Sequence, residues 1–439
     1  MAKFAQIKTA RITFKSNLKL TYMKFQPKEL FRHLKSKWIF ISCLFAFVAC
    51  HTSKKNDSLV IKDYRVFYDG QDEGYNTIGG DFIFEKGELI GVFTGGKPGD
   101  YETDKKPFLI RSNDTGKTWS KPELFAQSLL INSKESEKGG LSMSIFGPTL
   151  KGTLLTIGNQ LREGKEGSGK VADPQWRDNS LIIGRKENDA QKWIYNFYSS
   201  GTFLGEQFVG GGLQLPDGRL IFTIWGAKNK GENWRCGVLI SDNDGVSWKY
   251  RDVAYDPDTS IRDKSGVIAG FNEQTLFLTT DGKLISIIRG REKLGRVKDS
   301  PKDTWFFRSE SNDEGESWSE YELTNLAGTG ATSIGLTLPD GSLLQACRIP
   351  YSRKMYQLTE PDLYGLHFTR SFDEGKTWKT EQLLQKDPEG KPFTNYYNAM
   401  NGQFLKLNNK ECLYIFGQFD VKGKVFRILS CRLRFDKTL

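Results

Sequence analysis

Histidine and cysteine are scarce in this chain, which has three His and six Cys among its 439 residues. No Cys/His spacing resembles a zinc site, and so few His leave little for metal ligation. Neither a phosphate-binding glycine loop nor a Gly-x-Ser-x-Gly nucleophile motif is present. We therefore expect no metal and no cofactor.

Beyond residue 50, cysteine occurs at four positions, each in or beside an apolar, strand-like run: Cys236, Cys347, Cys412 and Cys431. The prediction is that these are buried free thiols. The alternative is a disulfide between Cys412 and Cys431 in the last hairpin, because an exported protein can form one.

Long apolar runs are also few. Residues 38–49 form one, and three basic residues precede it. This run is too short to span a bilayer comfortably and is typical of a signal-peptide core. It ends at Cys50, before a polar stretch, and so resembles a bacterial lipoprotein signal in which this Cys is lipidated. An ordinary secretory signal is the alternative.

These features predict how the chain is organised. We expect a signal peptide over residues 1–49, with Met23 as an alternative start, and the lipidated Cys50 with a short linker over residues 50–58. One folded domain occupies residues 59–439. The expected location is the outer membrane, on the periplasmic or the outer face, with Cys50 as the membrane anchor.

The basic charge of the chain does not belong to this domain. Residues 1–50 contain ten Lys or Arg and one Glu, so the net charge of +10 for the whole chain leaves only +1 for the rest. We therefore expect no nucleic-acid partner.

One eight-residue phrase recurs four times, as Ser112–Trp119, Ser241–Trp248, Ser311–Trp318 and Ser371–Trp378. This repeat phrase reads Ser-x-Asp-x-Gly-x-Thr/Ser-Trp, with Asn243 replacing the Asp in one copy. It predicts a tight hairpin turn, because the Asp accepts backbone hydrogen bonds and the Gly takes a positive φ. An Asn oxygen accepts as well, so that turn should survive. The Trp has the bulk to pack between neighbouring sheets.

A second repeat gives the number of units. Short turns flanked by apolar residues begin at six positions: Glu85, Leu150, Pro216, Thr280, Pro339 and Leu407. Their spacing of roughly 60–70 residues suits four short strands with their connections. The sequence thus predicts an all-β fold, a six-bladed β-propeller with four-stranded antiparallel blades.

Three further expectations concern single segments of this propeller. The strand-like run at residues 59–67 should add the last strand to the sixth blade and so close the ring. Residues 187–193 look like a decayed copy of the repeat phrase in the second unit, and Asp420–Gly423 like a remnant in the sixth. No amphipathic helix is expected after residue 60.

The repeat phrase on a six-unit β chain resembles the Asp box of the sialidase (neuraminidase) superfamily, over residues 60–436. The resemblance implies an active site built from an arginine clamp for the substrate carboxylate, a Tyr nucleophile, a Glu that takes its proton and an Asp general acid. Four residues match in order along the chain: Glu273, Arg289, Arg348 and Tyr397. Arg348 holds the same place in its unit as Arg289 does. Tyr396 is the alternative nucleophile, and Asp100 and Asp104 are the acid candidates.

The resemblance also fails at specific positions. No Arg stands near residues 75–78, where the first arginine of the family is expected. Only Lys97 is cationic near the place of the second. The family also has a Glu that supports the first arginine, and the neighbourhood of that Glu contains Gly417-Gln418 here. The joint loss of the Arg and the Glu is physically consistent, because a buried Glu without its Arg would be an unpaired charge. Trp225 and the glycine-rich residues 205–212 are candidate substrate walls.

These observations predict an exo-glycosidase similar to sialidases, with a retaining mechanism and altered specificity. Its partner would be a glycan or glycoconjugate. Two alternatives stay open. One is a glycan-binding lipoprotein without catalysis, which the missing arginine favours. The other is a polysaccharide lyase on the same fold.

Overall fold

The structure is a computed structural model that describes residues 59–70, 76–96, 106–126, 141–160, 180–198, 207–229, 232–257, 270–290, 305–328, 334–348, 364–394, 402–420 and 425–435. These residues contain 24 strands and no helix, as the sequence predicted. The strands form six four-stranded antiparallel sheets, which we call blades 1 to 6. The predicted six-bladed propeller is confirmed.

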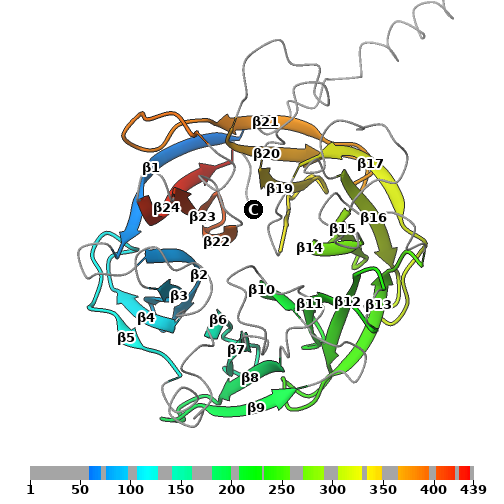
Figure 1. Cartoon of the computed structure of the whole chain (residues 1–439), viewed down its shortest axis with the longest axis horizontal. Helices are drawn as coiled ribbons and strands as arrows, with labels where there is room; N and C mark the ends of the chain where they lie inside the picture. Colours follow the sequence, from blue (N-terminus) through cyan, green and yellow to red (C-terminus); the bar gives the residue numbers. More distant parts are fainter. Residues whose placement is uncertain are drawn as a thin grey trace, which may run out of the picture. The chain divides into compact units, whose positions relative to one another are not determined.

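Blades 1 to 5 follow one another along the chain, and each runs from its innermost to its outermost strand. Blade 1 has β2 (Asn76–Glu85), β3 (Glu88–Gly96), β4 (Lys106–Ser112) and β5 (Glu123–Leu124); blade 2 has β6 (Leu141–Phe146), β7 (Leu154–Gln160), β8 (Ser180–Lys186) and β9 (Ile194–Tyr198); blade 3 has β10 (Gln207–Gln214), β11 (Leu220–Gly226), β12 (Arg235–Ser241) and β13 (Lys249–Ala254). Blade 4 has β14 (Phe271–Leu278), β15 (Leu284–Gly290), β16 (Trp305–Ser311) and β17 (Glu322–Ala327); blade 5 has β18 (Leu336–Thr337), β19 (Leu343–Arg348), β20 (Leu366–Ser371) and β21 (Lys379–Leu384). Figure 1 shows β2, β6, β10, β14 and β22 nearest the central axis.

Blade 6 joins the two ends of the domain. It contains β22 (Gly402–Asn408), β23 (Glu411–Asp420), β24 (Val425–Arg434) and, outermost, β1 (Val60–Asp69). β1 pairs antiparallel with β24, which confirms the predicted closure (Figure 1). The innermost strands also meet, because the Gln403 amide accepts from Phe82 N at 2.8 Å and donates to Phe82 O at 2.9 Å. The ring is therefore closed at its rim and at its axis.

The repeat phrases join the third and fourth strands of blades 1, 3, 4 and 5. In blade 4, Asp313 Oδ1 accepts from Ser317 N at 2.9 Å, and the Ser311 hydroxyl donates to Asp313 at 2.8 Å. Asn243 accepts from Ser247 N at 2.9 Å in the same way, so the substituted turn keeps its form. The expected positive φ of the phrase glycine is confirmed, for example 90° at Gly315.

The residue before that glycine has a positive φ as well, a feature that the sequence did not indicate. The four residues are Thr115, Asp244, Glu314 and Glu374, with φ between 57° and 61°. In blade 2, Asp189 has φ 63° at the matching place, and Lys186 pairs with Leu154 where the intact copies have Ser. This geometry supports a decayed copy at residues 187–193.

The predicted sixth remnant near Asp420–Gly423 is wrong. Asp420 ends β23 and Val425 begins β24, so these residues connect the second and third strands of their blade. The repeat phrase connects the third and fourth strands. In blade 6 the fourth strand is β1, which comes from the other end of the domain, so no such connection exists there.

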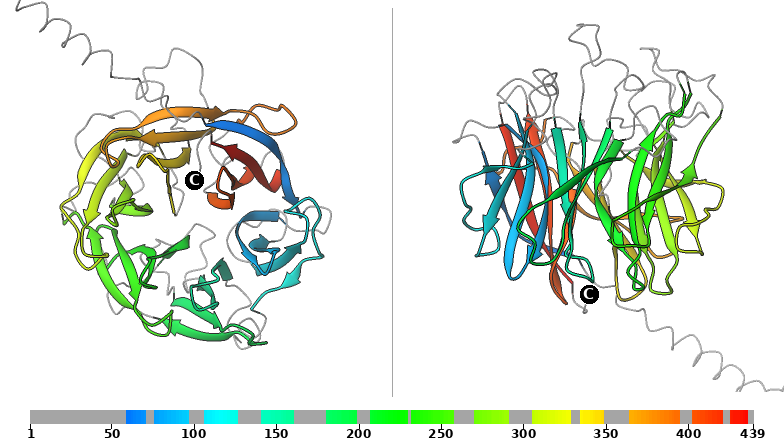
Figure 2. Two further views of the ribbon diagram at one scale, coloured as in Figure 1. Left: turned by 180° about the vertical axis from the view of Figure 1, so that it is seen from behind. Right: turned by 90° about the horizontal axis from the view of Figure 1, so that it is seen from below.

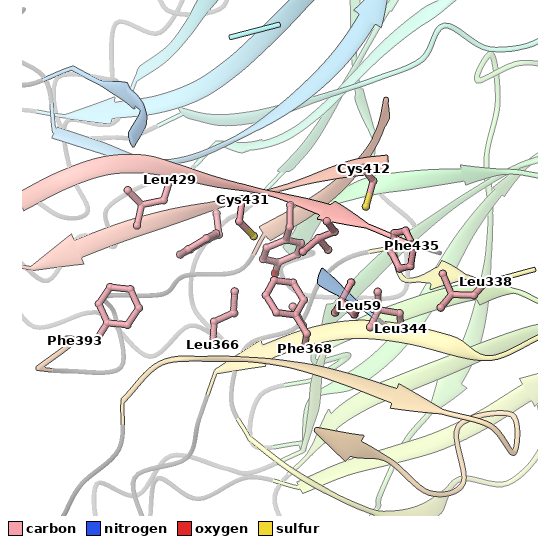
Figure 3. Packing of buried hydrophobic residues seen from close by; sticks show 14 residues of the cluster. Leu59, Leu338, Leu344, Leu366, Phe368, Phe393, Cys412, Leu429, Cys431 and Phe435 are labelled. Carbon is pink, nitrogen blue, oxygen red and sulfur yellow. The ribbon is translucent and has the colours of Figure 1, made fainter. Parts of the chain in front are cut away.

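The core lies between neighbouring blades rather than inside one sheet. Between blades 5 and 6, Leu344 and Phe368 face Cys412 and Cys431 (Figure 3). All four described cysteines are buried free thiols, as preferred from the sequence. Trp378 of the fifth-blade repeat phrase is buried among blade 4 residues, which confirms the packing role expected for these tryptophans.

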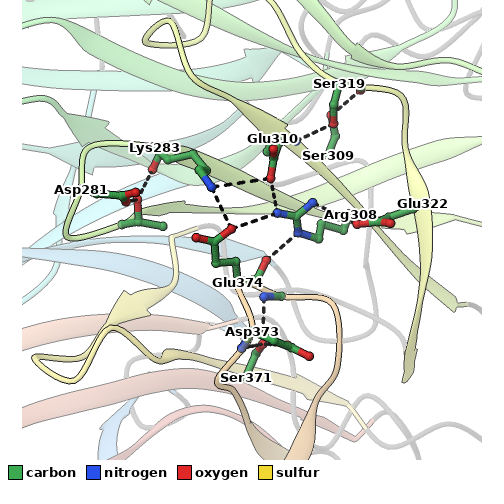
Figure 4. A network of polar contacts seen from close by, with 12 residues as sticks. Asp281, Lys283, Arg308, Ser309, Glu310, Ser319, Glu322, Ser371, Asp373 and Glu374 are labelled. Carbon is green, nitrogen blue, oxygen red and sulfur yellow. Dashed lines mark hydrogen bonds and ion pairs between the residues drawn. The ribbon is translucent and has the colours of Figure 1, made fainter.

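Charged groups join blades 4 and 5 around Glu374 of the repeat phrase (Figure 4). Arg308 is buried and donates to Glu374 O at 2.6 Å and to Glu322 at 3.0 Å, and it also pairs with Glu310. Lys283 reaches the Glu374 carboxylate at 2.8 Å. The phrase thus links its blade to the preceding one.

Candidate functional site

Glu273 and Arg289 form an ion pair at one end of the first hairpin of blade 4. Glu273 Oε2 lies 2.5 Å from Arg289 Nη1, and the two side chains are 19% and 20% exposed. Glu273 belongs to β14 and Arg289 to β15, whose strands pair from Leu278↔Leu284 to Phe271↔Gly290. The hairpin therefore brings the two residues together, as the sequence predicted.

A β-bulge turns Glu273 toward its partner. Asn272 pairs with Arg289 and Gln274 pairs with Ile288, so Glu273 is an extra residue in β14. Its φ is +27°, in the region that favours glycine. Bulges redirect side chains in this way and occur often beside active sites.

The bulge at Glu273 differs from the two comparable ones on inner strands. Register shifts also occur near the start of β2, where Gly79 has φ 126°, and in β10, where Gly211 has φ 70°. In those two blades a glycine takes the positive φ. In blade 4 a glutamate takes it, although a non-glycine residue pays about 1–2 kcal/mol for a left-handed backbone. The side chain of Glu273 makes an ion pair with Arg289 that a glycine could not make.

The negative charge of Glu273 affects the pKa of a cysteine in blade 3. Burial raises the pKa of the Cys236 thiol well above its usual range, and the negative charge of Glu273 raises it further. Cys236 lies on β12, so the Glu273 carboxylate lies on the side of blade 4 that is next to blade 3.

The register of each blade identifies one equivalent position on its second strand. In four blades a leucine pairs with the Ser that opens the repeat phrase: Leu89↔Ser112, Leu220↔Ser241, Leu284↔Ser311 and Leu343↔Ser371. Five residues further along are Thr94, Trp225, Arg289 and Arg348. The equivalence of Arg289 and Arg348, predicted from the repeat, therefore holds in the strand pairing. In blade 2, Leu154 pairs with Lys186, and the equivalent residue five positions after Leu154 is Asn159.

We call the end of the blades that carries these residues the arginine end, and the other the phrase end. Five residues of strand separate the two, about 17 Å at 3.4 Å per residue. Figure 2 shows the strands of all the blades running between these ends. The repeat phrases therefore do not contribute to a site at Glu273.

The two arginines lie on adjacent blades at this end. Arg348 is the last residue of β19 and is 5% exposed. Arg289 Nε is buried and has no hydrogen-bond partner among the described residues. Two guanidinium groups at one level can bind a carboxylate through several charge-assisted hydrogen bonds.

Trp225 occupies the equivalent position in blade 3, and packing accounts for it. Its ring centroid lies 4.7 Å from that of Trp234, and it packs against the core between blades 3 and 4. It pairs with Gln207 across β10 and β11. Among the glycine-rich wall residues, 207–212 lie on β10, and 205–206 lie outside the described residues.

Gln418 lies in the neighbourhood where the resemblance implies a supporting Glu, and it contacts Arg427. Its Oε1 accepts from Arg427 Nε at 2.7 Å. Arg427 also pairs with Asp387 at 3.1 Å and with Glu389 at 2.6 Å. Arg427 and Asp387 are only 8% and 5% exposed, so this pair fixes the loop after β21 to blade 6.

Asp81 is an acidic residue on β2, the innermost strand of blade 1, and the sequence did not indicate it as a site residue. Burial raises the pKa of Asp81 to about 7, and a hydrogen bond with Ser144 on β6 partly opposes this. The sequence signal was weak, because Asp81 lies outside every motif. Its neighbour Ser144 belongs to the next blade.

Several predicted site residues lie outside the described residues: Tyr396, Tyr397, Asp100, Asp104, Lys97 and Cys50. The residues that are described contain no group of His, Cys, Asp or Glu suited to a metal ion. No helix in the described part of the chain is long and apolar enough to cross a membrane.

This chain is similar to a known domain family and to several solved structures. Residues 199–415 match the model of the BNR repeat-like domain. A Dyadobacter fermentans protein of unknown function has a similar structure, with a TM-score of 0.63, 17% identity and coverage of 86% of this chain and 99% of its own. The Hadza microbial sialidase Hz136 gives a TM-score of 0.61 and 15% identity, covering 86% and 68%. A Penicillium chrysogenum α-L-arabinanase gives a TM-score of 0.56 and 11% identity, covering 87% and 100%.

The identities are low, so the similar structures establish the fold and not the activity. The domain match, the repeat phrases and the six-bladed ring agree with one another. The chain is therefore a six-bladed β-propeller in which residues 199–415 match the BNR repeat-like domain.

Proposed function

We propose that this protein is a glycoside hydrolase that removes an acidic sugar from the end of a glycan. One observation carries the proposal: Glu273 and Arg289 form an ion pair at the arginine end, and Arg348 holds the same register on the next blade. Relatives of this fold include sialidases and an arabinanase, which supports a glycan as substrate.

The arginines would bind the acidic group of the sugar. A guanidinium group matches a carboxylate with two parallel hydrogen bonds, which a lysine cannot provide. Arg289 already donates to Glu273 through Nη1, which leaves its other donors for a ligand. Thr77 lies in the segment where the family has a further arginine, so the clamp would contain two arginines instead of three.

The chemistry would be a double displacement with retention. Tyr397 attacks the anomeric carbon while Glu273 takes the phenolic proton, and Asp100 or Asp104 protonates the departing oxygen. Water then cleaves the glycosyl–tyrosine bond. In that second step the Asp removes a proton from water, and Glu273 returns its proton to the tyrosine oxygen. The Arg289 pair would hold Glu273 in place for both steps.

The test is hydrolysis of a panel of fluorogenic sialosides by residues 51–439, beside the Glu273→Ala variant. We expect activity in the parent protein and its loss in the variant. Asp313→Ala is the matched control, because it alters the phrase end of the same blade. If Glu273→Ala leaves hydrolysis of every cleaved substrate unchanged, the assignment is wrong.

Glycan binding without catalysis is the second candidate, favoured by the absence of an arginine at residues 75–78. It predicts that sialosides bind but are not hydrolysed. A lyase acting on a uronate would instead release unsaturated products that absorb in the ultraviolet. The same assays separate the three activities.

We also propose that the protein is exported and anchored by a lipid at Cys50. The apolar run before this Cys and the polar stretch after it support the proposal. Metabolic labelling with a radioactive fatty acid should mark the parent protein and not Cys50→Ser. Labelling of both would contradict a lipid at Cys50.

A further inference from the structure

A second group of polar side chains lies near the axis on blades 1 and 2, away from the arginines. The Thr94 and Ser142 hydroxyl groups are hydrogen-bonded at 3.0 Å. Asp81 and Ser144 are hydrogen-bonded to each other. Asp81 belongs to β2, Thr94 to β3, and the two serines to β6, so both bonds cross from one blade to the next.

Strand register places these groups at the arginine end. Thr94 holds the position in blade 1 that Arg289 holds in blade 4, and Ser142 pairs with Asn159, the equivalent residue in blade 2. Asp81 pairs with Val92, and Ser144 pairs with Ile157. These two residues therefore lie two positions further along the strands from the arginine end than Thr94 and Ser142 do. Figure 1 shows β2 and β14 on opposite sides of the axis. The group therefore lies on the other side of the axis from Glu273 and Arg289.

The group is partly accessible. Asp81 and Ser142 are half-buried, whereas Ser144 and Thr94 are buried. Thr77, on the same strand as Asp81, is fully buried, and its hydroxyl has no hydrogen-bond partner among the described residues. Unsatisfied buried hydroxyl groups are uncommon and call for an explanation.

The chemistry of this group suits neutral hydroxyl groups and not an anion. β2, β3 and β6 contain no lysine or arginine, so nothing in these strands offsets the charge of an ionised Asp81. An anionic ligand group would be repelled by that carboxylate. A sugar hydroxyl can donate to an ionised carboxylate or accept from a protonated one, and Ser and Thr offer the same versatility.

We propose that Asp81, Thr94, Ser142 and Ser144 form a hydroxyl-binding subsite that takes the neutral hydroxyl groups of a glycan. This inference deepens the proposed function and shares with it the assumption of a glycan ligand. The acidic group of the sugar would lie against blades 4 and 5, and its uncharged part against blades 1 and 2.

Binding of neutral probes tests the subsite independently of catalysis. Galactose, arabinose and glycerol would be titrated against the purified protein by saturation-transfer NMR. We expect binding to the parent protein, and at least about tenfold weaker binding to Asp81→Ala, since a lost hydrogen bond to a charged group is worth roughly 1.5–3 kcal/mol. Arg348→Ala should bind these neutral probes as the parent does.

Two further variants keep the test decisive if Asp81→Ala does not fold. Asp81→Asn keeps the shape and hydrogen-bonding capacity and should bind within a few-fold of the parent. Ser142→Ala changes only a half-buried hydroxyl and should weaken binding. The proposal is overturned if the parent binds no neutral probe, or if Ser142→Ala, and Asp81→Ala where it folds, bind as the parent does.

An acidic series separates this outcome from failure of the proposed function. Glucuronic acid and N-acetylneuraminic acid would be titrated against the parent and Arg348→Ala. Loss of acid binding in Arg348→Ala supports the clamp. Equal binding of the acids by the parent and by Arg348→Ala would contradict the arginine clamp. The hydroxyl-binding subsite would then be judged from the neutral probes alone.

Discussion

The carboxylate of Glu273 lies 2.5 Å from the guanidinium group of Arg289, and it reaches that place from a backbone with φ +27°. The two corresponding bulges in blades 1 and 3 have glycine at the positive φ. Blade 4 thus combines an unfavourable backbone with a specific side-chain contact. Strained residues of this kind cluster at functional sites.

Replacement of Glu273 should separate backbone strain from function. Both Glu273→Gly and Glu273→Ala lose the ion pair, but only glycine accepts the φ. We expect Glu273→Gly to be more stable than Glu273→Ala by about 1 kcal/mol in urea unfolding. Glycine usually destabilises a strand relative to alanine, so the opposite order would mean that this backbone is not strained.

Arg348→Lys tests the two-point recognition of the acidic group. Lysine keeps the charge but loses the planar pair of donors, so we expect KM for a cleaved acidic substrate to rise about tenfold or more. The change in kcat should be smaller. Kinetics of Arg348→Lys beside Lys379→Arg, an exchange on the outermost strand of the same blade, provide the measurement and its control. An unchanged KM would exclude bidentate binding by Arg348.

Asp81 should make stability depend on pH. Its folded pKa of about 7 lies above the usual 3.8, so the unfolded chain loses this proton first as pH rises. The contribution of Asp81 to stability is therefore complete below pH 4 and is lost between about pH 4 and pH 7, at roughly 1.4 kcal/mol per pKa unit as an upper limit. Asp81→Asn should remove this slope. Urea unfolding of both proteins at pH 4, 5.5 and 7 would show it, and parallel curves would contradict the shift.

The buried pair of Arg427 and Asp387 should matter more for stability than its exposed neighbour. Asp387→Ala leaves a buried arginine with a weaker set of partners, and we expect a loss of about 3 kcal/mol. Glu389→Ala removes a partner that is 45% exposed and should cost less than about 1 kcal/mol. Equal losses in thermal unfolding would show that burial does not decide the effect.

The repeat phrase should affect stability without affecting the site. Asp313→Ala removes acceptors for Ser317 N and for two hydroxyl groups, and it should cost about 1 kcal/mol. Its distance along the strand from Glu273 predicts unchanged kcat and KM once the variant is folded. A kinetic defect in the folded variant would contradict the separation of the phrase end from the arginine end.

The sequence by itself determined the architecture, because the blade repeats and so do its turns. The register of Arg289 and Arg348 could be predicted for the same reason, since both follow a turn by a fixed number of residues. Ring closure by β1 was also predictable, because one strand preceded the first unit. The false remnant at Asp420 shows the limit: a turn-like composition does not reveal which strands it connects.

The tertiary structure decided the contacts that cross between blades and the local irregularity within them. The bulge at Glu273 depends on the pairing of two strands and leaves no composition signal, since two other bulges use glycine. Asp81 meets Ser144 only because blade 1 packs against blade 2, and burial by that packing raises its pKa. Local periodicity specifies a blade, whereas the site arises from residues of different blades that only the closed ring brings together.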